Sequence, residues 1–148
     1  MMREYVTVHW TKYRYEDLQL PHTLDGYVYL VTYRGRCKYI GLAYSQTAAK
    51  RISAKSHIRE KYGELVDHLF IWVGQVEVAR NSFSYLTKPR IEAIEALLIH
   101  MNQPPDNEKF KKNYTRRPNL TVFSKGCPPL LPTVWAVNGV CFPASARP

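Results

Sequence analysis

The hydrophobic pattern divides the middle of the chain into two strands, a helix, a third strand and a second helix. β-Branched and aromatic residues flank Gly35, which predicts a hairpin over about residues 26–41 with the glycine in its connection. Residues 68–79 are mostly apolar and predict a third strand, central in its sheet because both of its faces are buried. Helices are expected at 45–62 and at 87–101.

The hairpin contains two tyrosines, Tyr29 and Tyr39, whose relationship depends on the length of the loop. With a three-residue loop over 34–36, Tyr29 lies opposite Gly41 and is a diagonal neighbour of Tyr39 on one face, with backbones roughly 7–8 Å apart. A two-residue loop would put the tyrosines on opposite faces, because a slip of one residue turns every side chain over. We expect the three-residue loop and a shared face. The alternative is an aromatic hairpin whose tyrosines only pack.

The chain is expected to have one main domain between two extensions. Residues 1–25 are read as an N-terminal extension, residues 26–107 as the domain, and residues 108–148 as a C-terminal extension, first basic and then rich in proline. Within the last segment, Asn138-Gly139 suits a type I′ turn and predicts a hairpin over 134–142. This tail is too apolar to remain unpacked, so we expect it on the domain or on a second copy of the chain, as in a homodimer.

Composition favours a single basic domain that binds an acidic partner. The chain has 148 residues, of which 45% are apolar, and this is enough for one core. Its formal net charge is +9, which suits a polyanion. We expect DNA as the partner and no membrane, because the sequence has no long apolar run and no basic amphipathic helix with a clean apolar face. A charge excess that serves only solubility is the alternative.

The cysteines and the N-terminal sequence indicate a reducing compartment. Cys37, Cys127 and Cys141 are odd in number and widely spaced, so they form neither a disulfide framework nor a zinc pattern. The first residues lack the apolar core of a signal peptide. We therefore expect a cytoplasmic or nucleoid-associated protein that is not secreted.

Glu95 is the carboxylate with the least expected surroundings. Its helical neighbours are Ile91, Leu98 and Ile99, so it lies on the shoulder of an apolar stripe. A carboxylate in that position is partly desolvated, which is unfavourable unless a cation or hydrogen bonds compensate. The alternatives are a functional site and a structural salt bridge to a nearby Lys or Arg.

Four elements in order resemble the signature of the GIY-YIG nuclease family. Tyr39-Ile40-Gly41 matches the second half of the signature, and Tyr27-Val28-Tyr29 matches the first half. The family continues with a helical arginine, for which Arg51 is the match, and closes with a helical glutamate, here Glu95, followed by an asparagine, here Asn107.

The resemblance covers about residues 26–107 and departs from the family pattern at two positions. Tyr27 stands where the family usually has glycine. His57 comes six residues after Arg51 rather than four, which places it about 120° around the helix. Lys50 and His57 share a face instead, and His57 is kept as a candidate catalytic residue.

The family resemblance implies a mixed α/β fold with a central three-stranded antiparallel sheet flanked by helices. It also implies phosphodiester hydrolysis with one divalent metal ion, Mg²⁺ or Mn²⁺, held by Glu95. Arg51 would bind the scissile phosphate through its planar guanidinium. Tyr29 or Tyr39 would take the proton from water, since a phenol near cations ionises below its usual pKa of about 10. Structural support is expected from Gly41 and Asn107.

The predicted function is a metal-dependent DNA endonuclease of a restriction, repair or mobile-element type. The alternative is a non-catalytic nucleic-acid-binding module that retains the nuclease fold. Metal-dependent nicking of DNA discriminates between the two. The basic residues expected to contact phosphates are Lys50, Lys55, Arg59, Lys109, Lys111, Lys112, Arg116 and Arg117.

Overall fold

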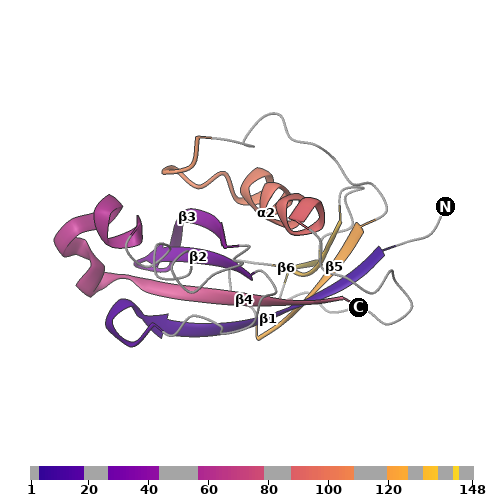
Figure 1. The fold of residues 1–148 in the computed structure, drawn as a ribbon, viewed down its shortest axis with the longest axis horizontal. Coiled ribbons are helices and arrows are strands. Elements are labelled where there is room, and N and C mark those ends of the chain that lie inside the picture. The colour runs from indigo at the N-terminus through magenta and orange to yellow at the C-terminus, as the bar shows by residue number, and fades with distance from the viewer. Residues whose placement is uncertain are drawn as a thin grey trace.

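The computed structural model describes residues 4–18, 27–43, 57–78, 88–108 and 120–126, and the backbone of two further strands at 132–136 and 142–143. These residues form a mixed α/β structure in which one long helix lies on a twisted sheet of seven strands (Figure 1). The elements are β1 (Glu4–Arg14), the 3₁₀ helix η1 (Tyr15–Asp17), β2 (Tyr27–Tyr33), β3 (Arg36–Ala43), the 3₁₀ helix η2 (Gly63–His68), β4 (Phe70–Val78), α2 (Lys88–Asn102), β5 (Leu120–Lys125), β6 (Pro132–Ala136) and β7 (Phe142–Pro143). Helical residues 57–62 lead directly into η2.

The expectation of a three-stranded sheet is wrong, although its three strands are present. The order β3-β2-β4-β1-β5-β6-β7 begins with the expected antiparallel strands and continues with strands from both terminal segments. β1 pairs antiparallel with β4 and parallel with β5. The physical reason is the alternation in β1, where Val6, Val8 and Trp10 are buried between polar residues. The residues taken as an N-terminal extension therefore supply a central strand.

The loop of the first hairpin has two residues rather than three. Arg34 and Gly35 have φ values of 51° and 75°, the left-handed pair that a type I′ turn requires. The register then shifts between Val31 and Thr32, because Lys38 is an extra residue in β3. This bulge moves the far half of the hairpin by one residue, so Tyr29 lies opposite Gly41 and shares a face with Tyr39. The expected shared face is confirmed, and the expected reason for it is wrong.

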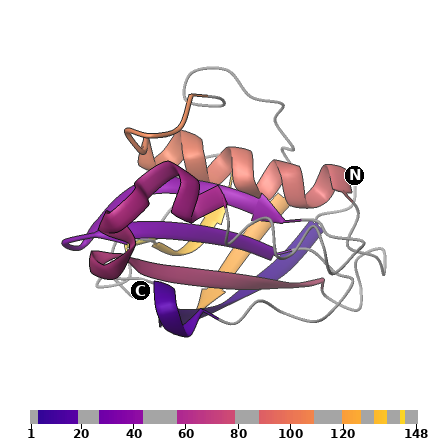
Figure 2. The same ribbon diagram turned by 60° about the vertical axis from the view of Figure 1, so that its left-hand side comes forward.

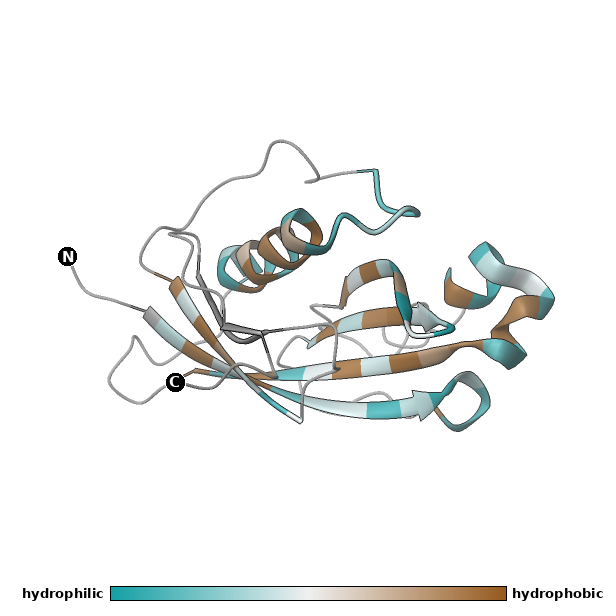
Figure 3. Cartoon of the chain, turned by 180° about the vertical axis from the view of Figure 1, so that it is seen from behind, coloured by the Kyte–Doolittle hydropathy of each residue, from teal (hydrophilic) through white to brown (hydrophobic). Residues whose placement is uncertain are grey.

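Two hydrophobic clusters cover the two faces of the sheet. On one face, Ile94 and Leu98 of α2 pack with residues of β1, β2, β3 and β5, among them Val8, Leu30 and Ile40. On the opposite face, residues of β2 and β4 pack against the 57–69 segment, and this cluster includes Tyr29, Val31, Ile58, Val66 and Ile71. Figure 2 shows the 57–68 segment and α2 on either side of the β2–β3 hairpin. Figure 3 shows the alternation of apolar and polar residues along the strands and around α2 that allows this arrangement.

The remaining sequence predictions have mixed outcomes. The third strand and the second helix are confirmed at Phe70–Val78 and Lys88–Asn102, and β4 is central as expected. The C-terminal strands β6 and β7 pair antiparallel, while the Asn138-Gly139 turn between them lies outside the described residues, as does the first part of the 45–62 helix. Within the described residues, no helix is long and apolar enough to cross a membrane.

Candidate active site

Tyr29 lies under the 57–69 segment with its phenol across the neighbouring strand. It is 4% exposed and stands opposite Gly41 of β3. A Cβ atom at position 41 would overlap the tip of the Tyr29 ring, including its hydroxyl oxygen. Glycine is therefore required here so that the phenol can cross β3 toward the edge of the sheet.

Tyr39 links Tyr29 to the helical residues 57–62. The ring centroids of Tyr29 and Tyr39 are 6.2 Å apart, and those of Tyr39 and His57 are 5.9 Å apart. The Nζ atom of Lys61 lies 5.0 Å from the centroid of the Tyr39 ring, within cation–π distance. Tyr39 and the exposed His57 and Lys61 therefore form a half-open rim beside the buried Tyr29.

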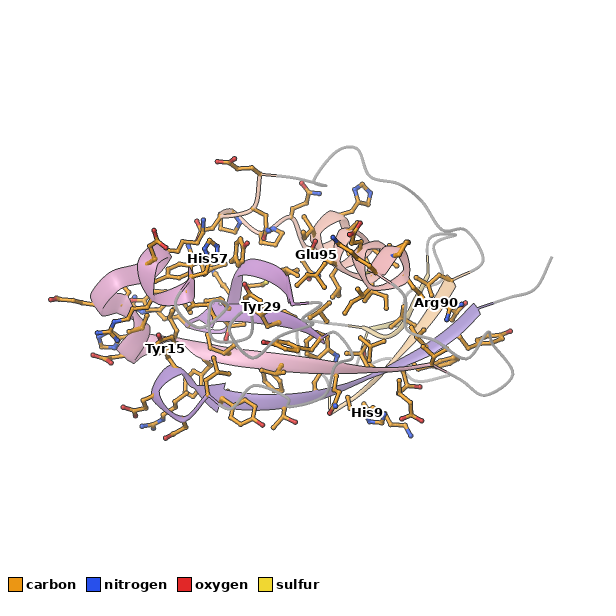
Figure 4. All side chains as sticks on the ribbon, in the orientation of Figure 1. His9, Tyr15, Tyr29, His57, Arg90 and Glu95 are labelled. Atoms are coloured by element: carbon orange, nitrogen blue, oxygen red, sulfur yellow. The ribbon has the colours of Figure 1, made fainter. Side chains whose placement is uncertain are left out.

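Glu95 acts electrostatically on both tyrosines. It is half-buried on α2, on the shoulder of the helix where the sequence places it. Burial raises the pKa of Tyr29 well above its usual range, and the charges of Tyr39 and Glu95 raise it further. Burial also raises the pKa of Tyr39, followed by the charge of Glu95. Tyr29, Tyr39 and Glu95 come from three elements, β2, β3 and α2. Figure 4 shows Tyr29 and Glu95, together with His57, on the same part of the molecule.

This electrostatic arrangement differs from the acidic tyrosine expected from the sequence. In the chain alone, a carboxylate near the phenols and their removal from water both favour the protonated form. Tyr29 and Tyr39 are thus hydrogen-bond donors in the chain alone, and either could accept a proton only where positive charge outweighs both burial and the charge of Glu95. The same carboxylate that raises these pKa values is the group able to attract that positive charge.

Asn107 is bound to β3 at the outer edge of the sheet. Its side chain is buried: Oδ1 accepts from the backbone N–H of Ile40 at 2.8 Å, and Nδ2 donates to the carbonyl of Ile40 at 2.9 Å. The backbone N–H of Asp106 donates to the carbonyl of Lys38, the bulge residue, at 3.0 Å. The segment after α2 therefore replaces a neighbouring strand along β3 and fixes the strand that carries Tyr39 and Gly41.

Tyr62 and Asp106 belong to the same structure and were missed by sequence reasoning. The hydroxyl of Tyr62 donates to Oδ2 of Asp106 at 2.7 Å. Burial and this hydrogen bond raise the pKa of Tyr62 well above its usual range. The bond ties the helical residues 57–62 to the segment that holds β3. A tyrosine in the stripe of an exposed helix was the available signal, but nothing in the sequence pairs it with Asp106.

Several predicted site residues lie outside the described residues. Of the set expected to bind phosphate, Arg59 is described and is exposed beside Ile58 of the buried cluster. The others that lie outside are Arg51, Lys50, Lys55, Lys109, Lys111, Lys112, Arg116 and Arg117. The part of the site described here thus consists of Tyr29, Tyr39, Gly41, His57, Glu95 and Asn107.

A metal ion at this site would take one carboxylate from the described residues. Among them, no group of three or more His, Cys, Asp or Glu side chains could hold a metal ion. Mg²⁺ is commonly bound by one or two carboxylates, with water and substrate phosphate oxygens completing its octahedral shell. Glu95, a single half-buried carboxylate on α2, fits this pattern better than it fits a closed structural metal site.

Compared with known proteins, the chain matches no family model, no curated protein and no solved structure. Its function is therefore inferred from the chemistry of the site.

Proposed function

We propose that the chain is a divalent-metal-dependent DNA endonuclease of the GIY-YIG type that hydrolyses phosphodiester bonds. The observation that carries the proposal is the placement of two tyrosines on one face of a sheet, within the electrostatic reach of one half-buried glutamate. Phosphodiester hydrolysis needs a proton acceptor for water and positive charge near the phosphate. The tyrosines supply the proton acceptor, and Glu95 attracts the positive charge.

The residues have separate roles in this mechanism. Glu95 would hold Mg²⁺ or Mn²⁺, which supplies charge neutralisation at a non-bridging oxygen and at the leaving 3′ oxygen. Tyr29, whose ring lies over Gly41, would take the proton from water where nearby positive charge outweighs the effects of burial and of Glu95 on its pKa. Tyr39 at the rim orients that water, and His57 and Lys61 face the approaching phosphate.

DNA binding completes the proposal through residues inside and outside the described part of the chain. Arg51 is proposed to bind the scissile phosphate with its guanidinium, and the other lysines and arginines expected from the sequence would contact the flanking backbone. Arg59 and Lys61 are exposed on the helical residues beside Tyr39, which is a suitable position for such contacts. The net charge of +9 supports a polyanionic substrate.

A second candidate function is nucleic-acid binding without cleavage. The observation that favours it is the burial of Tyr29, which is 4% exposed and has a raised pKa, as a purely packing tyrosine would. A binding module has no use for a half-buried glutamate beside that tyrosine. For this reason we favour the endonuclease.

Plasmid nicking with two matched glutamine variants tests the proposal. Glu95→Gln keeps the shape of the side chain and removes its charge, so metal-dependent nicking should fall at least about 100-fold, as expected when several kcal/mol of charge stabilisation are lost. Glu92→Gln is the control, because Glu92 lies on the exposed side of α2, 4.0 Å from Lys88. It should nick supercoiled and branched DNA like the unaltered protein, in Mg²⁺ and not in chelator.

Three outcomes are distinguishable in this experiment. Nicking that Glu95→Gln retains in full would contradict the site. Absence of nicking by the unaltered protein on every substrate, with intact DNA binding, would favour the binding module. A lower melting temperature in Glu95→Gln, with activity preserved below it, would identify Glu95 as a structural residue.

A further inference from the structure

The face of the sheet that carries Tyr29 continues beyond the 57–69 segment onto β1 and β5. The pairing register places Tyr27, Gln75, His9 and Lys125 in one row across β2, β4, β1 and β5. The next row contains Glu77, Thr7 and Phe123. Alternation along each strand puts both rows on the face opposite α2, and Figure 4 shows His9 on that side of the molecule.

An aromatic pair with one exposed ring, Phe123, and one half-buried ring, Tyr5, lies on this part of the face. The rings of Tyr5 and Phe123 are stacked, with centroids 6.1 Å apart and an interplanar angle of 29°. Phe123 is 39% exposed and is one of two large apolar side chains exposed among the described residues. The other, Leu65, belongs to η2. The pairing of β1 with β5 makes Tyr5 and Phe123 diagonal neighbours, since Thr7 is the register partner of Phe123.

Polar and basic groups surround the aromatic pair. Lys125 is exposed two residues along β5 from Phe123, on the same face and beside His9. His9 contacts Glu77 through Nε2 at 2.7 Å, and the side chains are 42% and 70% exposed. Gln75 and Thr11 are also exposed. The surface thus combines a flat aromatic centre with hydrogen-bonding groups, and its one described carboxylate, Glu77, is engaged with His9.

We propose that this open face, defined by Tyr5, Thr7, His9, Gln75, Phe123 and Lys125, binds single-stranded nucleic acid by stacking unpaired bases on the Phe123–Tyr5 pair. Exposed aromatic rings on a sheet surface are a sequence-tolerant platform for unpaired bases, because every base has a π-face. Duplex DNA cannot use such a platform, since its bases are stacked on one another. A chain with a net charge of +9 supplies the long-range attraction for the phosphates.

The position of the platform suggests its use. The row Tyr27–Gln75–His9–Lys125 runs on the same face as Tyr29, from the strand of the candidate active site to the platform. The DNA strand bound at Phe123 would be the unpaired strand that leaves a duplex at a branch or flap. This guiding role rests on the proposed nuclease function, whereas binding at the platform does not.

Binding of an oligothymidylate, measured without metal, tests the platform independently of cleavage. The probe is a fluorescein-labelled oligothymidylate of about 15 nucleotides, which spans a typical site of this kind, and affinity is read from anisotropy with the full chain. Phe123→Leu keeps an apolar residue in β5 and removes the π-face, so affinity should fall roughly 5- to 100-fold. Phe123→Trp keeps a ring and should bind at least as tightly as the unaltered protein.

Leu65→Ala is the matched surface control, because it removes the other exposed apolar side chain at a site away from β5. It should leave the affinity unchanged. Circular dichroism and thermal melting identify any variant that fails to fold. If Phe123→Leu fails, Phe123→Trp decides the question by its indole fluorescence, which stacking on a base should quench when oligothymidylate binds, beyond any change in the unaltered protein; unquenched fluorescence would overturn the proposal. Equal affinities of the unaltered protein, Phe123→Leu and Phe123→Trp would overturn the proposal. A concentration-dependent dimer that Phe123→Leu abolishes, with oligothymidylate affinity unchanged, would assign the face to a second copy of the chain instead.

Discussion

Tyr29 and Phe123 lie on the same face of one sheet, yet Tyr29 is 4% exposed and Phe123 is 39% exposed. The difference arises from what covers each half of the face. The 57–69 segment packs on the half formed by β2 and β4, while the described residues leave the half formed by β1 and β5 open. Aromatic residues on one face of the sheet are therefore buried or exposed according to whether another segment packs on them.

The covered half places a buried phenol within the electrostatic reach of a half-buried carboxylate. Exclusion of water raises the pKa of Tyr29 and strengthens the effect of each nearby charge. In the open half, the exposed Phe123 is stacked on the half-buried Tyr5, with polar groups around the pair. We therefore propose that the covered half carries out the chemistry and that the open half recognises unpaired bases. Each of these assignments can be tested separately.

The largest expected effect is on the covered half, at the hydroxyl of Tyr29. Tyr29→Phe keeps the ring over Gly41 and removes the proton acceptor, so nicking should fall by about 10²- to 10⁴-fold, the usual contribution of a general base. Tyr33→Phe is the control from the same strand, where the ring lies 5.1 Å from the guanidinium of Arg34 at the tip of the hairpin. Equal nicking rates for both variants would remove Tyr29 from the mechanism.

A smaller effect is expected from the segment that holds the edge of the covered half. Asn107→Ala removes both side-chain hydrogen bonds to Ile40 and leaves buried backbone groups without them, so the free energy of unfolding should fall by about 2–3 kcal/mol. Gln103→Ala is the control, since Gln103 is exposed and its side-chain amide donates to the carbonyl of His100 in the same segment. Denaturant unfolding measures both.

The same variant sharpens the comparison between the two halves. Because Asn107 is bound to β3, which β2 and β4 separate from β1 and β5, oligothymidylate affinity should be unchanged in Asn107→Ala below its melting temperature. A loss of oligothymidylate binding that parallels the loss of stability would show that the two halves do not act separately.

The sequence was sufficient for the elements whose signals are local. The β2–β3 hairpin, β4 and α2 follow from composition and periodicity within short segments. The alternation around Val6, Val8 and Trp10 was also a strand signal, but the segment was read as an extension because its partners are distant. The parallel pairing of β1 with β5 joins residues 4–9 to residues 120–125, and no local pattern specifies such a pairing.

The site was predictable in part for the same physical reason. Tyr29, Tyr39 and Glu95 were selected from spacing and from an unusual helical neighbourhood, and these depend on nearby residues. The Lys38 bulge has no local sequence signal, and the backbone hydrogen bond that its carbonyl accepts comes from Asp106, which is distant in the chain. The Tyr62–Asp106 bond likewise depends on how two distant segments pack.

The most direct measurement of the central claim is whether a divalent cation binds at Glu95 beside the two tyrosines. The chain has 11 tyrosines, and ¹³C labelling of their rings allows each signal to be assigned with Tyr→Phe variants. Millimolar Mn²⁺ should broaden the signals of Tyr29 and Tyr39 selectively, because paramagnetic relaxation falls steeply with distance. The broadening should persist in Glu92→Gln and disappear in Glu95→Gln. Signals of Tyr29 and Tyr39 that remain sharp in Mn²⁺, or that broaden equally in both variants, would contradict a metal site on Glu95.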